Sequence, residues 1–291
     1  MNRKSFIKKS VLGLFGLSAA QISSPHELAT ESTQALAPVG FNHLPPKKTY
    51  PMKTVFHPAN SRGHANHGWL NSHHSFSFAN YYNPERMHFG VLRVLNDDEV
   101  APGQGFGTHP HENMEIISIP LEGNLEHKDS MGSKALIKQG DVQVMSAGTG
   151  VYHSEYNASK QEPVKFLQIW VFPKTQGVEP RYDQITLDPD KMRNQLHQVL
   201  SPDPDDEGVW IHQDAWFYLG NFEAGQQAAQ ALKQKGNGFY LFLLEGAIQV
   251  GDQKLNSRDA LGIWETDKLE FSALSASRVL LMEVPMELPR A

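Results

Sequence analysis

The sequence of 291 residues contains no cysteine. This absence excludes disulfides, zinc ribbons, thiolate nucleophiles and cysteine-ligated clusters, so any metal ion must be held by nitrogen and oxygen ligands. The chain also has no excess of positive charge, because 26 Lys and Arg face 32 Asp and Glu and the formal net charge is −6. Without a basic stripe to neutralise phosphates, nucleic acid is not an expected partner.

Long apolar runs are missing as well. The run from Val11 to Ala20 is shorter than the roughly 20 residues that span a bilayer, and a cationic stretch from Asn2 to Ser10 precedes it. This order predicts a secretory signal over residues 1–20, with a short uncleaved anchor or a frayed tail as the alternative. Arg3 to Lys8 resembles the twin-arginine export motif with one Arg replaced by Lys. We therefore expect an exported, periplasmic protein without a stable membrane anchor.

Residues 21–50 contain four prolines and little periodicity, which predicts a linker. Beyond it, 23 Gly, 18 Pro and 28 aromatic residues (15 Phe, 8 Tyr and 5 Trp) favour a turn-rich β protein. Short β-branched and aromatic runs predict strands of a sandwich or jelly-roll barrel. These runs are Phe89–Leu95, Met114–Leu121, Val142–Met145, Val164–Phe172, Phe239–Leu244, Ala247–Val250 and Arg278–Val284.

The strand-like segments form two similar series. Leu-Glu-Gly ends a run at residues 121–123 and again at 244–246, which suggests a duplicated unit. The length suits two domains, and we place them at residues 51–182 and 183–291. Residues 190–197 could form one short helix. Residues 224–235 are helical by propensity and extended by analogy with the first series, and the sequence leaves this open.

Histidines concentrate in the first series, where twelve of the 14 precede residue 181. His109 and His111 are two apart, and His153 and Glu155 repeat this spacing 44 residues later (153 − 109). Residues two apart on a strand share one face, so two adjacent strands could offer three imidazoles and one carboxylate to one ion. Such a set suits Fe(II), Mn(II), Ni(II) or Zn(II). A lone His-x-His pair is more often structural, and the matching second pair is what favours ligation.

Several longer motifs resemble signatures of the pirin family, over about residues 54–285. The motifs are SRGHANHGWL (61–70), FSFANYYNP (76–84), LRVLNDD (92–98), GFGTHPH (105–111), HKDSMG (127–132) and MSAGTGVYHSEYN (145–157). The resemblance implies an all-β fold of two tandem cupin domains, jelly-roll β-barrels, of which the second is degenerate and lacks the metal. Most cupins take the carboxylate ligand from the first motif, here Glu115. Pirins take it from the second, here Glu155, so the implied ligands are His109, His111, His153 and Glu155.

The resemblance also implies a function. Some bacterial pirins resemble quercetin 2,3-dioxygenases, so we expect a metal-dependent dioxygenase, a monomer, that uses Fe(II) and O2 to open the ring of a small aromatic substrate such as a flavonol. In this reading Glu155 is also catalytic and takes the proton of the flavonol 3-hydroxyl. Eukaryotic pirins are nuclear co-regulators, a role that an export signal argues against. The alternative is a non-enzymatic metal-binding or redox-sensing protein, or one whose metal serves stability alone.

Overall fold

The computed structural model describes residues 52–289, which form four antiparallel-dominated β-sheets and two short 3-10 helices. The predicted signal and linker lie outside the described residues. Within these residues no helix is long and apolar enough to cross a membrane.

The first two sheets form the N-terminal barrel. Its larger sheet has the order β12-β9-β6-β11-β4-β3-β2, and its smaller sheet the order β5-β10-β7-β8. The strands are β2 (Gly63–Asn66), β3 (Leu70–His74), β4 (Leu92–Val100), β5 (Gly105–His111), β6 (Glu115–Glu122), β7 (Asn124–Asp129), β8 (Lys134–Lys138), β9 (Asp141–Ser146), β10 (Val151–Asn157), β11 (Val164–Val171) and β12 (Arg181–Thr186).

The other two sheets form the C-terminal barrel, with the orders β1-β20-β17-β22-β15-β13-β14 and β16-β21-β18-β19. The strands are β1 (Lys53–His57), β13 (His197–Ser201), β14 (Val209–Trp210), β15 (Trp216–Phe222), β16 (Gln227–Ala231), β17 (Asn237–Glu245), β18 (Ala247–Val250), β19 (Gln253–Asn256), β20 (Ala260–Trp264), β21 (Lys268–Ala273) and β22 (Ser277–Pro285). The sheet orders of the two barrels match strand for strand, so the fold is duplicated. The predicted all-β architecture of two jelly-roll barrels is confirmed.

The repeated Leu-Glu-Gly marks equivalent turns. Gly123 follows β6 with φ +75° and Gly246 follows β17 with φ +89°, and β6 and β17 hold the same place in their sheets. A Cβ at Gly246 would collide with the carbonyl oxygen of Ala276, and one at Gly123 would lie 3.1 Å from that of Pro163. Both the positive φ and the crowding explain why glycine stands at these two turns.

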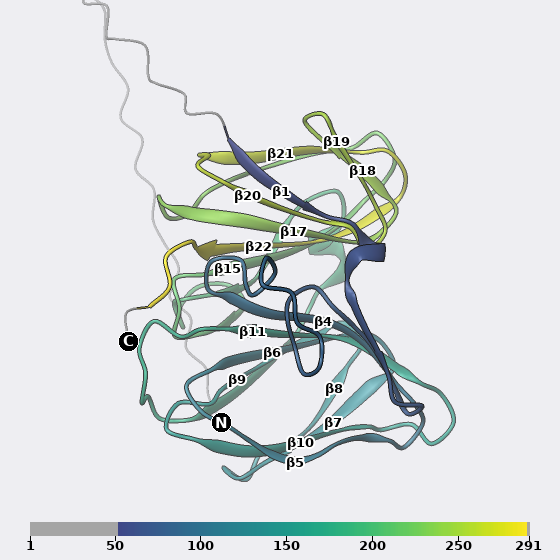
Figure 1. The fold of residues 1–291 in the computed structure, drawn as a ribbon, viewed down its shortest axis with the longest axis vertical. Coiled ribbons are helices and arrows are strands. Elements are labelled where there is room, and N and C mark those ends of the chain that lie inside the picture. Colours follow the sequence, from purple (N-terminus) through teal and green to yellow (C-terminus); the bar gives the residue numbers. More distant parts are fainter. Residues whose placement is uncertain (1–51, 290–291) are drawn as a thin grey trace, which may run out of the picture. The chain divides into compact units, whose positions relative to one another are not determined.

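One strand crosses from the start of the chain into the second barrel. β1 pairs with β20, from Lys53 opposite Trp264 to His57 opposite Ala260, and lies beside it in Figure 1. β12 takes the equivalent place in the first barrel, paired with β9. The boundary predicted after residue 182 therefore falls inside β12, whose pairing continues to Thr186 in the sheet of the N-terminal barrel.

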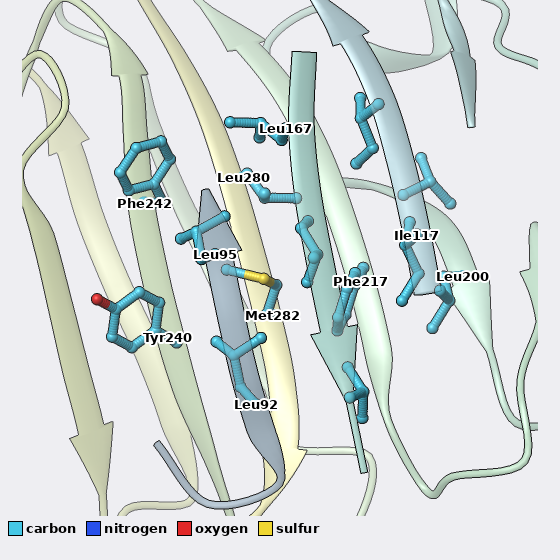
Figure 2. Packing of buried hydrophobic residues seen from close by; sticks show 14 of the residues in the cluster. Leu92, Leu95, Ile117, Leu167, Leu200, Phe217, Tyr240, Phe242, Leu280 and Met282 are labelled. Carbon is cyan, nitrogen blue, oxygen red and sulfur yellow. The ribbon is translucent and has the colours of Figure 1, made fainter. Parts of the chain in front are cut away.

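The two seven-stranded sheets pack against each other through their apolar faces (Figure 2). Leu92 and Leu167 of one sheet meet Phe217, Tyr240 and Met282 of the other in a single buried cluster. Alternation along each strand sends the neighbouring residues into the two barrel interiors. Burying one such side chain contributes about 1.5–3 kcal/mol to the free energy of folding, so this apolar layer stabilises the contact between the barrels.

Residues 190–197 and 224–235, for which the sequence suggested possible helices, are both largely non-helical in the structure. Residues 190–197 contain only the end of a 3-10 helix, η2 (Pro189–Met192), so the helix predicted there is wrong. Asp188 caps its start by accepting from the amide of Asp190 at 3.0 Å, and β13 already begins at His197. Residues 227–231 are extended and pair with β21, as the duplication favoured. The other short 3-10 helix, η1 (Ala59–Ser61), follows β1.

Candidate metal centre

Two neighbouring strands of the smaller sheet bring three histidines together. In the β5–β10 pair, His153 lies directly opposite His109, and His111 follows on the same face. The ring centroids of His153 lie 4.4 Å from His109 and 4.9 Å from His111, and those of His109 and His111 are 4.8 Å apart. One ring nitrogen from each residue lies within 4.8 Å of the others, a separation that one ion of this class could bridge.

A close backbone approach makes this possible. A Cβ at Gly105 would come within 2.5 Å of the Cα of Tyr156 and would collide with the carbonyl oxygen of Glu155. Glycine at this position therefore lets β5 lie against β10, which sets the spacing of the histidines that the two strands carry.

Hydrogen bonding and burial prepare the histidines to donate a lone pair to a metal ion. Nδ1 of His109 donates to the carbonyl oxygen of Gly107 at 2.7 Å, which leaves the Nε2 lone pair free. Burial and the neighbouring His109 lower the pKa of His111 to about 4. Burial and the surrounding histidines lower the pKa of His153 to about 2. Neutral imidazole is the form that binds metal ions.

Both ring nitrogens of His153 are buried without a hydrogen-bond partner within residues 52–289. An orphaned imidazole in the interior is costly, and a metal ion would relieve it. The three nitrogen donors and a nearby carboxylate fit Fe(II), Mn(II), Ni(II) or Zn(II), which accept such ligands.

Glu155 lies next to the three histidines but is held by other groups. It is 1% exposed, and its two carboxylate oxygens accept from Ser118 Oγ and Gln168 Nε2, each at 2.9 Å. A register shift in the β5–β10 pair falls between His153 and Glu155, and Glu155 is not in the close group. Burial raises its pKa to about 7 against the two hydrogen bonds. Its role as fourth ligand stays a prediction.

A cavity of about 410 Å³ opens onto the histidines. His109 and His111 form part of its wall, whereas His153 and Glu155 do not. Most of the remaining lining is aromatic or polar: Trp69, Phe78, Phe106, Trp170, His67, Ser72, His74, Asn96, Asp98 and Gln168. Such a cavity accepts a flat apolar ligand that carries a few polar groups.

Other polar residues line this interior. Ser72 donates to Asp98, whose pKa burial raises to about 7, and Nδ1 of His74 lies 2.9 Å from Oδ1 of Asn96. These four residues were not among the predicted residues of the metal site. Alternation along β3 and β4 could have pointed to them, because Ser72 and His74 share one face.

Glu115, the alternative carboxylate, lies on the other side of the sheet. It is 1% exposed and accepts from Ser146 Oγ at 2.7 Å. It shares its face of β6 with Ile117, which belongs to the layer between the barrels. Burial raises its pKa to about 7. Glu115 therefore lies buried at the interface between the two barrels, away from the three histidines.

The interior of the C-terminal barrel is apolar. Phe239, Leu241, Ile263, Leu269 and Leu281 belong to its buried cluster. Of the groups of His, Asp and Glu within residues 52–289, the three histidines of the first barrel are the one set close enough to share an ion.

Comparisons with known proteins agree with this architecture. Residues 55–171 match the family profile described as pirin, and residues 198–284 the one described as quercetinase C-terminal cupin domain. A quercetin 2,3-dioxygenase of Escherichia coli K12 is 45% identical over 227 residues, covering 78% of this chain and 96% of that protein. A pirin-like protein of Caulobacter vibrioides is 38% identical, covering 78% and 97%. The crystal structure of the bacterial pirin YhhW from E. coli in complex with nickel(II) superposes with a TM-score of 0.76 at 42% identity, covering 82% of this chain and 100% of that one.

Two tandem barrels with matching sheet orders, one of them carrying the histidine group, define a two-cupin protein. The chain belongs to the pirin family, as the sequence motifs indicated.

Proposed function

We propose that this pirin is a metal-dependent dioxygenase of the quercetin 2,3-dioxygenase type, which opens the ring of a flavonol with O2. The observation that carries the proposal is the convergence of three histidines beside a cavity, of which two line its wall together with several aromatic side chains. The name of the E. coli relative supports the same substrate class.

His109, His111 and His153 would hold one Fe(II) ion, with Glu155 as fourth ligand. When bound, the ion supplies Lewis acidity and redox chemistry with O2. The nickel(II) complex of the E. coli pirin supports an ion at this site and leaves the choice of metal to experiment.

The chain's own residues would bind the substrate and move its proton. Trp170 packs edge-on against His111 at 4.9 Å and against Phe78 at 5.4 Å, so these aromatic side chains form a wall beside the metal position. A carboxylate with a pKa near 7, such as Glu155, is suited to accept the proton of the 3-hydroxyl at neutral pH. To reach it, Glu155 exchanges its hydrogen bond with Gln168, which lines the cavity.

The test is quercetin turnover by purified protein loaded separately with Fe(II), Mn(II), Ni(II) and Zn(II). We expect loss of the flavonol absorbance together with O2 uptake, fastest with Fe(II). Fully loaded protein that leaves quercetin intact under air would contradict the proposal and favour a metal-binding or redox-sensing protein without turnover.

We also propose that the protein is exported and works in the periplasm. The support is the cationic stretch followed by the apolar run of residues 1–20. Cell fractionation with N-terminal sequencing should find a mature chain that begins after about Ala20 in the periplasmic fraction. A full-length chain in the cytoplasmic fraction would contradict export.

A further inference from the structure

A third pair of polar side chains lies beside the candidate metal centre. His127 and Asp129 are two apart on β7, which pairs with β10. In this register Asp129 lies opposite His153, and His127 lies opposite Glu155. Residues two apart on a strand share one face, and these four side chains are all buried in the barrel interior.

Buried polar atoms without partners gather at this place. Over the part of the chain that the structure describes, both ring nitrogens of His127, both of His153 and Oδ2 of Asp129 have no hydrogen-bond partner. Each such atom destabilises the folded protein when it stays unpaired. These five atoms belong to three neighbouring side chains, which could form a chain of hydrogen bonds once a metal ion is bound.

His127 lies close to both of the other two residues. Its ring centroid lies 5.3 Å from that of His153, and its Nδ1 lies 4.0 Å from Oδ2 of Asp129. The latter distance is too long for a direct hydrogen bond and suits one bridging water. Tyr182 of β12 packs on the ring of His127 at 4.8 Å, which holds the plane of the ring.

Asp129 is fixed by its other oxygen. Oδ1 accepts from the backbone amides of Met131 and Ser133, each at 2.9 Å, in the turn after β7. These two bonds anchor the carboxylate and leave Oδ2, which is buried, for a partner in the interior.

We propose that His127 and Asp129 are positioning residues for His153. A metal-binding histidine uses one ring nitrogen for the ion and donates the N–H of the other to a fixed acceptor. His127 accepts from His153 and in turn donates, through water, to Asp129, so each orphaned atom gains a partner. The chain of contacts fixes the tautomer and the ring orientation of His153. This inference rests on the metal centre of the proposed function.

The test uses Zn(II), a diamagnetic probe, and the variant Asp129→Asn. The amide oxygen of Asn still accepts the two turn bonds, while an NH2 donor replaces the acceptor Oδ2. We expect the Kd for Zn(II), measured by competition with a chelator, to rise about 10- to 100-fold. His127→Phe keeps the stacking on Tyr182, removes both nitrogens and should raise the Kd similarly.

Asp259→Asn is the matched control. Asp259 also accepts from two backbone amides, those of Ala59 and Asn256, but it belongs to the C-terminal barrel. We expect its Kd for Zn(II) to equal that of the wild type. If His127 and Asp129 had only a structural role, their variants would be less stable but the NMR resonances of the His153 imidazole would not change.

The second readout is therefore 15N-resolved NMR of the Zn(II)-loaded protein. The wild type should show a slowly exchanging imidazole N–H of His153, which Asp129→Asn and His127→Phe should lose. Wild-type Kd and an intact N–H resonance in His127→Phe would overturn the inference and leave the metal centre standing. A wild type that binds no Zn(II) would overturn the metal centre itself. If Asp129→Asn does not fold, His127→Phe decides the question by the same two measurements.

Discussion

Different contacts orient the three histidines toward the same position. His109 is oriented by a hydrogen bond to the backbone carbonyl of Gly107 in the same strand, whereas the ring of His111 packs against the edge of Trp170. His153 is the most enclosed of the three, and its nitrogens have no partner in the described structure. Burial keeps His111 and His153 neutral, so a metal ion need not displace a proton from them at neutral pH.

His153→Ala should therefore abolish metal binding. The substitution removes the central donor, and two histidines on one strand hold an ion poorly without it. We expect bound metal after dialysis, measured by mass spectrometry, to fall from about one ion per chain to near zero. His197→Ala, which removes a histidine of the C-terminal barrel, is the control and should keep its metal. Stoichiometric metal in His153→Ala would show that the ligand assignment is wrong.

Glu155→Gln separates binding from catalysis. An amide can still offer an oxygen to the metal but cannot accept a proton, so turnover should fall by about 10²–10⁴-fold with a smaller loss of metal affinity. Steady-state quercetin oxidation and metal titration of the same preparation measure the two effects. Glu115→Gln replaces another buried carboxylate with a pKa near 7, one that faces the layer between the barrels and lies away from the histidines, and it should leave turnover unchanged. If Glu155→Gln loses metal and activity together, Glu155 is a ligand and is not established as a base.

At the scale of elements, the site depends on the contact between β5 and β10. Gly105 permits this contact because any side chain there would meet the backbone of β10. Gly107, two residues further on the same strand, is less crowded, since a Cβ would meet only the hydroxyl of Tyr156 at 3.7 Å. The two glycines thus form a matched pair on one strand.

Gly105→Ala should separate the strands and weaken the metal site, whereas Gly107→Ala should not. Overpacking of this kind typically costs about 1–3 kcal/mol, and the displaced β5 carries His109 and His111 away from His153. Thermal unfolding and metal titration should both show the difference between the two variants. Equal metal affinity in Gly105→Ala and Gly107→Ala would show that the contact does not set the geometry.

Local patterns were enough to predict most strands. The run Val164–Phe172 became β11, and Phe239–Leu244 lies within β17, because β-branched and aromatic side chains suit the two buried faces of a central strand. The two-residue spacing also indicated that His109, His111 and His153 could converge, and the structure brings these three together. The same signal was present in His127 and Asp129 of the HKDSMG motif, although the sequence analysis assigned them no role.

Long-range pairing could not be predicted in this way. Nothing in Lys53–His57 shows that this strand pairs with β20, about two hundred residues later. The hydrogen bonds of Glu155 depend on Ser118 and Gln168 from two other strands, which a pattern along one strand does not reveal. The helix predicted at residues 190–197 failed because the pairing of β13 with β15 starts at His197 and overrides local propensity.

At the scale of the whole molecule, a duplicated fold has two different interiors. Asp141 is the first residue of β9 and Asp259 directly precedes the equivalent strand β20, and each accepts from the amide three residues earlier at 2.8 Å. The first barrel buries histidines and carboxylates beside an apolar cluster, and the interior of the second consists of side chains such as Phe, Leu and Ile. The apolar barrel and the shared layer between the sheets stabilise a polar interior that would be costly alone.

The interface between the two barrels contains a buried titratable side chain, Glu115. Glu115 accepts from Ser146, and the backbone of His212, which lies in the C-terminal half, favours its charged form. Its other oxygen, Oε1, is buried and has no partner in residues 52–289. Arg181 contributes a weaker opposing effect, so burial still raises the pKa from 4.5 to about 7.

This shift predicts how stability depends on pH. Between about pH 4.5 and 7 the folded state holds a proton on Glu115 that the unfolded state has released. Stability from this group is therefore complete at low pH and is lost as the pH rises through about 7. Glu115→Gln, which is neutral at every pH, should raise the free energy of unfolding by about 1–3 kcal/mol at about pH 8 and by almost nothing near pH 4. Urea unfolding of the metal-free protein measures this, with Glu126→Gln, an exposed residue of β7, as control. A Glu115→Gln protein less stable than the wild type at about pH 8 would contradict this prediction and would show that the charged carboxylate stabilises the interface between the barrels.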